Sequence, residues 1–434
     1  MKIKIKQKSY DEVLALPPAA HKKPRRQSLF WRTLLRAVAT PDLAATHFRC
    51  EKIGMERLGR REPALFLMNH SSFIDLEIAA RMLFPRPYNI VCTTDGFVGK
   101  NLLMRLLGCI PTNKFVPDLN LVRDMIYTTK TLHSSVLMFP EAGYSFDGTA
   151  TRLPDSLGKC AKLLGVPVVI IKTFGAFARD PLYNNLQRRH VTVSATMEYL
   201  LSPEEIKQLS AAEIAEKISA RFTFDNFRWQ QENHVRVSEP FRADYLNRLL
   251  YKCPTCHAEG KTEGKGEHLT CHACGKSWFL DEYGVLSATT GDTEFPHIPD
   301  WFRWQRECVR RELEENRYLL DTDVDIYMLT DTKCLYHVGE GHLTHSRAGF
   351  RLTGCDGKLE YTQDPILSYT LNADFNWYEI GDVISIGTNR ALYYCFPKGS
   401  SDVAAKARLA TEELYDIVYE ERRLLHEAAR AARR

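Results

Sequence analysis

The sequence predicts an α/β domain with a mostly parallel sheet, then a small cysteine-containing ribbon, and then a C-terminal α+β domain in which antiparallel strands precede one helix. Three observations support this order. Short apolar runs alternate with helical stretches between residues 50 and 200, four cysteines cluster between residues 253 and 274, and alternating runs precede a long amphipathic helix at the end. A length of 434 residues also favours several domains.

The strands of the first domain are predicted from short apolar runs. These runs cover residues 64–68, 89–92, 135–139, 166–172 and 191–195. Helical stretches such as 75–83 separate them, which is the order typical of a mostly parallel sheet. We assign residues 49–245 to this domain.

The N-terminal segment carries most of the positive charge. Residues 1–36 hold ten Lys or Arg against Asp11 and Glu12, a net charge of +8, while the whole chain has +4, so the remainder has 4 − 8 = −4. A basic arm on a mildly acidic body favours an anionic partner. Charge alone leaves a lipid surface and a nucleic acid as alternatives.

A helix is predicted over residues 28–39. Phe30, Leu34 and Val38 recur every four residues beside basic side chains, a pattern that suits the interface of a bilayer. The alternative is an ordinary helix packed on the domain that follows. We interpret residues 1–48 as a basic arm and an amphipathic membrane-surface helix.

Composition indicates a globular protein of a reducing compartment. Hydrophobic residues make up 44% and charged residues 26%, close to the averages for folded domains. No apolar stretch is long enough to span a membrane, and no signal peptide is recognisable. Eight of the twelve cysteines lie singly. We therefore expect a cytoplasmic protein, peripheral on the cytoplasmic face of the membrane.

A histidine and an aspartate follow the first predicted strand. His70 lies in the loop after residues 64–68, and Asp75 follows five residues later. If Ser72 is the N-cap of the next helix, Asp75 lies in its first turn and can meet the imidazole. A carboxylate on one ring nitrogen leaves the other free to take a proton from a hydroxyl. The alternative is that Asp75 only completes a capping box with Ser72.

Two further segments follow later apolar runs. Residues 108–114 offer close backbone approach at Gly108 and a cation at Lys114, and residues 139–145 place Glu141 directly after a proline. Taken singly, the first segment reads as a solvated turn and the second as a surface loop.

The order of these segments, together with the Val-Pro strand at 166–172, resembles the glycerolipid acyltransferase family, the 1-acylglycerol-3-phosphate acyltransferases in particular. The resemblance covers about residues 50–200. It implies that His70 is the catalytic base and Asp75 its partner.

The same resemblance implies a set of substrate-binding residues: Gly108, Lys114, Glu141 and Ser145. The chain departs from the family at Tyr144, where an Arg thought to hold the phosphate of the acceptor is usual. The resemblance therefore does not determine the acceptor lipid, and Arg152 or Arg123 are other sources of a guanidinium group.

Two Cys-x2-Cys pairs predict a metal site. Their spacing lets two turns close tetrahedrally around structural Zn²⁺. The predicted ligands are Cys253, Cys256, Cys271 and Cys274. Because four thiolates complete the shell, the nearby His257, His268 and His272 are interpreted as bystanders. We assign residues 246–287 to a zinc ribbon.

Residues 288–434 are predicted to form a β-rich domain with a C-terminal helix. A helix is expected at 301–313 and a long helix from about residue 402. The expected strands are 325–329, 333–338, 350–352, 366–369, 383–386 and 391–396. Antiparallel strands followed by one helix resemble the architecture of pleckstrin-homology domains, and an unrelated α+β domain is the alternative.

These features predict an acyltransferase of phospholipid biosynthesis. The donor would be acyl-CoA or acyl-carrier protein, the acceptor a lysolipid, and the C-terminal modules would recruit the enzyme or bind a protein partner. A membrane adaptor with a catalytically weak acyltransferase-like domain is the alternative. Nucleic-acid binding is disfavoured because the ribbon lacks a basic face with aromatic platforms.

Overall fold

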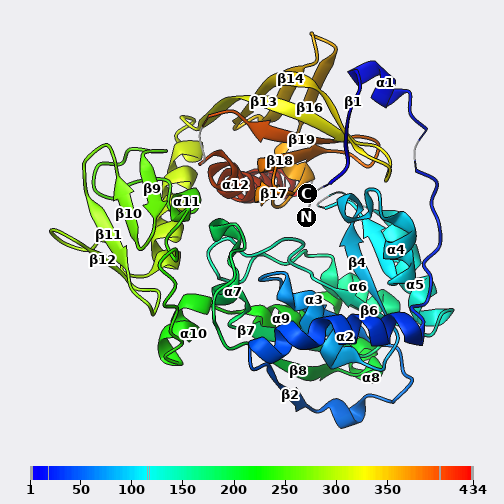
Figure 1. Cartoon of the computed structure of the whole chain (residues 1–434). Helices are drawn as coiled ribbons and strands as arrows, with labels where there is room; N and C mark the ends of the chain where they lie inside the picture. The colour runs from blue at the N-terminus through cyan, green and yellow to red at the C-terminus, as the bar shows by residue number, and fades with distance from the viewer. Residues whose placement is uncertain (1–2, 18, 115, 117, 400–401, 432–434) are drawn as a thin grey trace.

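The computed structural model describes residues 3–17, 19–114, 116, 118–399 and 402–431. Figure 1 shows an α/β domain at the bottom right, a ribbon at the left and a β-rich domain at the top. The long C-terminal helix lies between the upper sheet and the α/β domain. These three parts contact one another through a shared core.

The sheet of the α/β domain has the strand order β2-β8-β7-β3-β6-β4-β5. Within the described residues, five neighbouring strands run parallel, and β8 and β2 run the other way. The mostly parallel sheet that the sequence predicts is therefore a mixed sheet. The bounds are β2 Arg49–Ile53, β3 Leu65–Met68, β4 Tyr88–Thr93, β5 Cys109–Thr112, β6 Ser135–Met138, β7 Val168–Phe174 and β8 Ser194–Leu201.

Helices cover both faces of this sheet because its central strands are apolar on both sides. Phe66 and Met68 pack on the side of α2 and α3, whereas Leu65 and Leu67 pack on the side of α5, α6 and α9. The bounds are α2 Leu29–Ala45, α3 Ile74–Leu83, α4 Asn101–Leu106, α5 Leu119–Lys130, α6 Leu157–Leu164, α7 Ala176–Arg179, α8 Pro203–Gln208, α9 Ala211–Phe222 and α10 Asn226–Glu232. Helix α2 continues six residues beyond its predicted end.

The cysteine-containing segment forms a small antiparallel sheet of order β12-β11-β10-β9. Trp278 of β11 packs edge-on against Trp301 of the following helix α11, with ring centroids 4.9 Å apart, and both rings are fully buried. The ribbon therefore shares its core with the part of the chain that follows. The bounds are β9 Thr262–Lys265, β10 His268–Cys271, β11 Ser277–Leu280, β12 Leu286–Ala288 and α11 Ile298–Glu314.

The C-terminal domain has antiparallel strands in the order β16-β15-β14-β13-β19-β18-β17, followed by helix α12 Val403–Ala431. Strands β16 and β17 were not predicted, and the strand expected at 366–369 is wrong. Asp364 caps a 3-10 turn over Pro365–Leu367 there, with its carboxylate accepting from the Ile366 N–H. The strand bounds are β13 Leu319–Leu329, β14 Leu335–Ser346, β15 Gly349–Gly354, β16 Leu359–Gln363, β17 Asn372–Trp377, β18 Gly381–Gly387 and β19 Leu392–Pro397.

The beginning of the chain is attached to the C-terminal domain. Strand β1, Ile5–Gln7, pairs in parallel with β14, and helix α1, Tyr10–Leu14, buries Val13 in the shared core. The Tyr10 hydroxyl lies 3.2 Å from that of Tyr393. Figure 1 shows the chain then running down to α2 on the other domain. The first part of the expected basic arm, residues 5–14, is thus ordered and packed on the C-terminal domain.

Among the described helices, none combines the length and the apolar composition that crossing a bilayer requires.

Candidate active site

The predicted catalytic loop lies at the carboxyl end of the sheet. His70 follows β3, and Glu141 follows the neighbouring parallel strand β6. Because parallel strands end at the same edge, the two loops meet there, which is where open α/β sheets keep their sites.

The His70 and Asp75 side chains are in contact. His70 Nδ1 lies 3.1 Å from Asp75 Oδ2, and the same oxygen accepts the N–H groups of Ser71 and Ser72 at 2.6 and 3.0 Å. Thr173 of β7 donates its hydroxyl to the other oxygen at 3.5 Å. Asp75 is fully buried, so these donors stabilise its carboxylate form.

The expected cap of α3 differs in the structure. The helix begins at Ile74, and its N-cap is Phe73, which has no side-chain acceptor, so the prediction of Ser72 as N-cap is wrong. The carboxylate of Asp75 accepts the Ser72 N–H in the manner of a capping residue. Asp75 therefore has both roles that the sequence left as alternatives: it caps the loop and orients His70.

The outward nitrogen of His70 is free to act. With Asp75 as acceptor, the proton is assigned to Nδ1, which leaves Nε2 with a lone pair. No hydrogen-bond partner of Nε2 is found among the described residues, and the side chain is 19% exposed. This geometry suits a general base.

Two aromatic rings hold the His70 imidazole between them. The Phe139 ring stacks on the imidazole, with ring centroids 4.2 Å apart and an interplanar angle of 26°. The Tyr144 ring is tilted against the imidazole, with a centroid distance of 4.2 Å and an interplanar angle of 39°. The sequence interpretation missed this role of both residues. Their position on either side of Glu141 was a signal, since a catalytic histidine needs neighbours that fix its plane.

Glu141 and Ser145 hold the backbone of His70. One carboxylate oxygen of Glu141 accepts the His70 N–H at 2.8 Å, and the other accepts the Thr151 N–H at 2.9 Å. The Ser145 N–H donates to the His70 carbonyl at 3.1 Å, and its hydroxyl donates to Thr149. Burial is the main cause that raises the pKa of Glu141 to about 7, against the N–H groups that lower it.

Lys114 lies just beyond the carboxyl end of β5 and lines a cavity of about 420 Å³ between the two large domains. The C-terminal domain contributes Arg390, apolar side chains such as Leu371 and Ile386, and no Asp or Glu among the described residues that line it. Neither Lys114 nor Arg390 forms an ion pair with a described residue. The cavity therefore presents two cations beside apolar surface, and Lys114 interacts electrostatically with Asp374 of β17.

Gly108 lies at the other end of β5, away from His70. Its φ of +79° is a conformation that favours glycine, and a Cβ there would lie 3.2 Å from the Tyr88 carbonyl oxygen. Its own carbonyl accepts the side-chain amide of Asn89 at 2.8 Å. The backbone explains this glycine, and the structure does not bring it to the catalytic pair.

The C-terminal domain closes over the edge of the site. Arg408 of α12 is buried, donates to the Tyr144 carbonyl at 3.5 Å and lies 4.3 Å from the Phe146 ring centroid. Phe375 of β17 packs on Phe146 at 4.5 Å. No motif could have found Arg408, because it lies 264 residues from Tyr144 and helical spacing alone places it in a core. Arg152, a suggested source of a guanidinium, pairs with Asp416 of the same helix.

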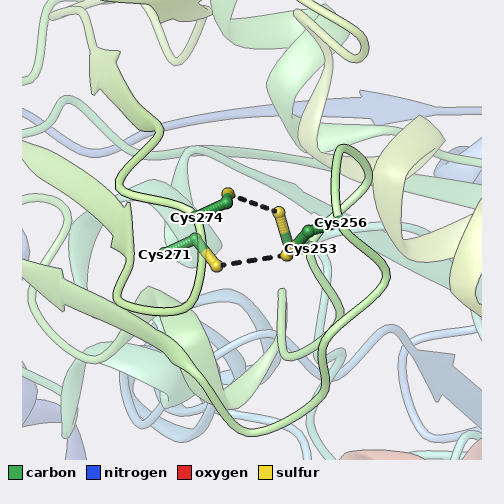
Figure 2. A group of neighbouring side chains, drawn as sticks. All are labelled: Cys253, Cys256, Cys271 and Cys274. Carbon is green, nitrogen blue, oxygen red and sulfur yellow. Dashed lines mark hydrogen bonds between the residues drawn. The ribbon is translucent and has the colours of Figure 1, made fainter.

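The four cysteines converge at one point of the ribbon (Figure 2). Cys253 and Cys274 have their Sγ atoms 3.8 Å apart, and Cys256 and Cys271 have theirs 3.7 Å apart. Tetrahedral Zn–S bonds of about 2.3 Å require sulfur atoms about 3.8 Å apart. All four sulfur atoms lie within 4.8 Å of one another, so they can bind a metal ion.

The neighbouring histidines lie outside this group. His272 contacts Glu263 at 2.8 Å, while His257 and His268 pack beside aromatic rings. The metal-binding group found among the described residues consists of the four cysteines alone.

Part of the chain is similar to known acyltransferases. Residues 49–172 match the family model for acyltransferases. The matched segment contains His70, Asp75 and Glu141 with the strands that position them. No curated protein sequence matches the chain.

One similar solved structure is the 1-acyl-sn-glycerophosphate (LPA) acyltransferase PlsC from Thermotoga maritima. The two chains are 17% identical, and the match covers 44% of this chain and 78% of the other, with a TM-score of 0.32.

The raised pKa of Glu141 predicts a pH-dependent stability. The unfolded chain releases this proton near pH 4.5 and the folded protein near 7, so the stabilising contribution is complete below 4.5 and is lost as the pH rises through about 7. Between these values the wild type should lose up to ~3 kcal/mol of unfolding free energy that Glu141→Gln does not lose. Urea unfolding of both proteins across this range measures the difference. If the unfolding free energies of the two proteins changed in parallel with pH, the raised pKa of Glu141 would be contradicted.

Proposed function

We propose that the chain transfers a fatty acyl group from acyl-CoA or acyl-carrier protein to the hydroxyl of a glycerolipid, with 1-acylglycerol-3-phosphate as acceptor, in phospholipid biosynthesis. The observation that supports this most directly is the free Nε2 of His70, whose Nδ1 contacts the buried Asp75 inside an acyltransferase-family segment. This is the arrangement that deprotonates an alcohol.

The proposed reaction replaces the thioester bond of the donor with an ester bond to the acceptor. His70 Nε2 takes the proton of the acceptor hydroxyl as the oxygen attacks the thioester carbonyl carbon. The C–S bond then breaks, an ester forms, and the thiolate leaves and takes the proton back from the imidazolium. Asp75 stabilises the positive imidazolium between the two steps, and base catalysis of this kind contributes ~10² to 10⁴-fold.

The cavity beside Lys114 is the proposed binding site for the head of the acceptor. A phosphate monoester carries negative charge, and the acyl chain is apolar, which complements two cations on an apolar wall. Arg390 would take the place of the guanidinium that the family carries where this chain has Tyr144. Gly108 has no assigned contact with substrate in this proposal, and Glu141 and Ser145 act by positioning His70.

The alternative function is a membrane adaptor. The observation that favours it is Tyr144, whose ring covers one face of His70 at the position of the usual arginine. Under this alternative the site would bind lipid without turnover.

We also propose that helix α2 docks on the cytoplasmic surface of a membrane. Phe30 and Val38 are 66% and 67% exposed on one side of this helix. Phe30→Ser with Val38→Ser should lower flotation with phosphatidylcholine vesicles, and unchanged flotation would contradict the docking.

Thiol release tests the enzyme. Purified protein is given palmitoyl-coenzyme A or palmitoyl-acyl-carrier protein with a panel of lysolipids. Turnover with 1-acylglycerol-3-phosphate is expected, and His70→Ala should lower it by ~10² to 10⁴-fold. His426→Ala, at an exposed position of α12, is the control and should keep full activity. Silence with every acceptor and both donors would favour the adaptor, and turnover by His70→Ala would contradict the mechanism.

Lys114→Met tests the acceptor site. Losing one charge-assisted hydrogen bond should raise KM for 1-acylglycerol-3-phosphate by about tenfold or more, while KM for an uncharged monoacylglycerol stays unchanged. Arg390→Gln should act in the same direction. Lys130→Met, at the exposed end of α5, is the control. Equal effects on charged and uncharged acceptors would contradict the assignment.

Structural Zn²⁺ is the proposed ion of the four cysteines, because thiolates at these separations match its tetrahedral shell. Metal analysis should find one zinc per chain. A chelator should lower the melting temperature, because the ribbon shares its core with the C-terminal domain. Cys256→Ser should do the same, whereas Cys50→Ser, an exposed single cysteine, should not. Metal-free protein with an unchanged melting temperature would contradict the proposal.

A further inference from the structure

A second and larger cavity lies away from His70. It has a volume of about 1060 Å³ and is formed by Phe66 of β3, Met197 of β8, Arg32 of α2 and the end of α3. The other lining residues include the segment just before β4 and a residue just before β6. These places mark the amino edge of the parallel strands, opposite to the edge that carries His70.

The lining of this cavity is strongly basic. Its cations are Arg26, Arg32, Lys52, Arg60, Arg61 and Arg86, and the described residues that line it include no Asp or Glu. None of the six forms an ion pair with a described residue, whereas Arg306 of α11 pairs with Glu412 and Glu413. The lining of the cavity therefore supplies no carboxylate to compensate this positive charge.

Two of these cations are half-buried. Arg32 has no hydrogen-bond partner for Nε among the described residues, and burial, with repulsion from Arg26, lowers its pKa. Arg86 donates to the carbonyls of Glu62 and Gly59, and burial lowers its pKa also. A half-buried cation without a counter-ion costs free energy, so an anion in the cavity would stabilise the fold.

The floor of the cavity is apolar. Phe66, Met82, Leu83 and Met197 are all buried there. Arginine forks match the oxygen atoms of phosphate, and the floor matches methylene groups. The cavity thus suits a ligand that joins a phosphate group to an apolar part.

We propose that this cavity binds the phosphate headgroup of an anionic phospholipid, separately from the acyl-transfer site. Arg32 lies about 200° around α2 from Phe30, so it faces the cavity on the side away from the exposed stripe formed by Phe30 and Val38. A lipid surface on the side of the molecule that exposes Arg60 and Arg61 would bring headgroups to the cavity. The site would select membranes rich in anionic phosphate.

Vesicle binding tests the proposal with a matched pair of double variants. Arg60→Gln with Arg61→Gln removes two exposed cations of the cavity, and Lys261→Gln with Lys265→Gln removes two exposed cations of the ribbon. Vesicles are phosphatidylcholine with or without phosphatidate, at about 0.15 M salt. The cavity variant should bind phosphatidate vesicles at least about tenfold more weakly, while the ribbon variant stays within about twofold of wild type. Equal losses in both variants, or no loss, would overturn the proposal.

Soluble phosphate compounds distinguish a lipid headgroup from a free phosphate compound as the ligand of the cavity. Glycerol 3-phosphate and coenzyme A should not release the protein from phosphatidate vesicles beyond the effect of potassium chloride at equal ionic strength. Specific release by either compound would assign the cavity to a free phosphate compound and overturn the lipid assignment.

Arg32→Gln gives a second readout. Because Arg32 has no counter-ion in the protein, this change should keep or raise the melting temperature while it weakens phosphatidate binding. A lower melting temperature with unchanged binding would overturn the proposal. His70→Ala should bind vesicles as the wild type does, so a failure of the proposed acyl transfer leaves this test intact.

Discussion

The buried carboxylate of Asp75 is the constraint on which the site depends. A fully buried charge is tolerated only with several donors around it, and Asp75 receives the N–H groups of Ser71 and Ser72, the Nδ1–H of His70 and the hydroxyl of Thr173. These contacts fix the loop after β3, the first turn of α3 and the end of β7 relative to one another. The orientation of His70 follows from the way in which this carboxylate is satisfied.

The second half of the chain takes part in this arrangement. Arg408 contacts the carbonyl of Tyr144, whose ring lies on His70, and Phe375 packs against Phe146. The strand β1 joins the first residues of the chain to the same C-terminal sheet. The C-terminal domain therefore contacts β1, which precedes the α/β domain in the chain, and its helix α12 contacts the loop that carries Tyr144. The C-terminal domain is part of the environment of the site.

The sequence predicts the elements of this protein better than it predicts their contacts. Apolar runs identify β3, β4, β6 and β7 because buried parallel strands are apolar on both faces. The pairing of β1 with β14 has no local signal, since three exposed residues depend on a partner more than 300 positions away. Strand β17 alternates half-buried polar residues with buried apolar ones, so it contains no continuous apolar run of the kind that identified the other strands.

For the site as well, the sequence predicts individual residues better than it predicts the contacts between distant segments. The order of motifs predicts His70, Asp75 and Glu141 as site residues, and the structure brings the three together at one edge of the sheet. The basic cavity around Arg32 was not predicted, since its six cations come from five separate segments and only the fold brings them together. The sequence shows charge, and tertiary structure decides whether that charge is paired.

The most direct test of the central claim is kcat for acyl transfer by Asp75→Asn. An amide can accept the proton of His70 Nδ1 but cannot stabilise the imidazolium as a carboxylate does, so kcat should fall by ~10³ to 10⁴-fold with little change in KM. A kcat within about tenfold of wild type, in a variant that remains folded, would contradict the role of this pair as the base.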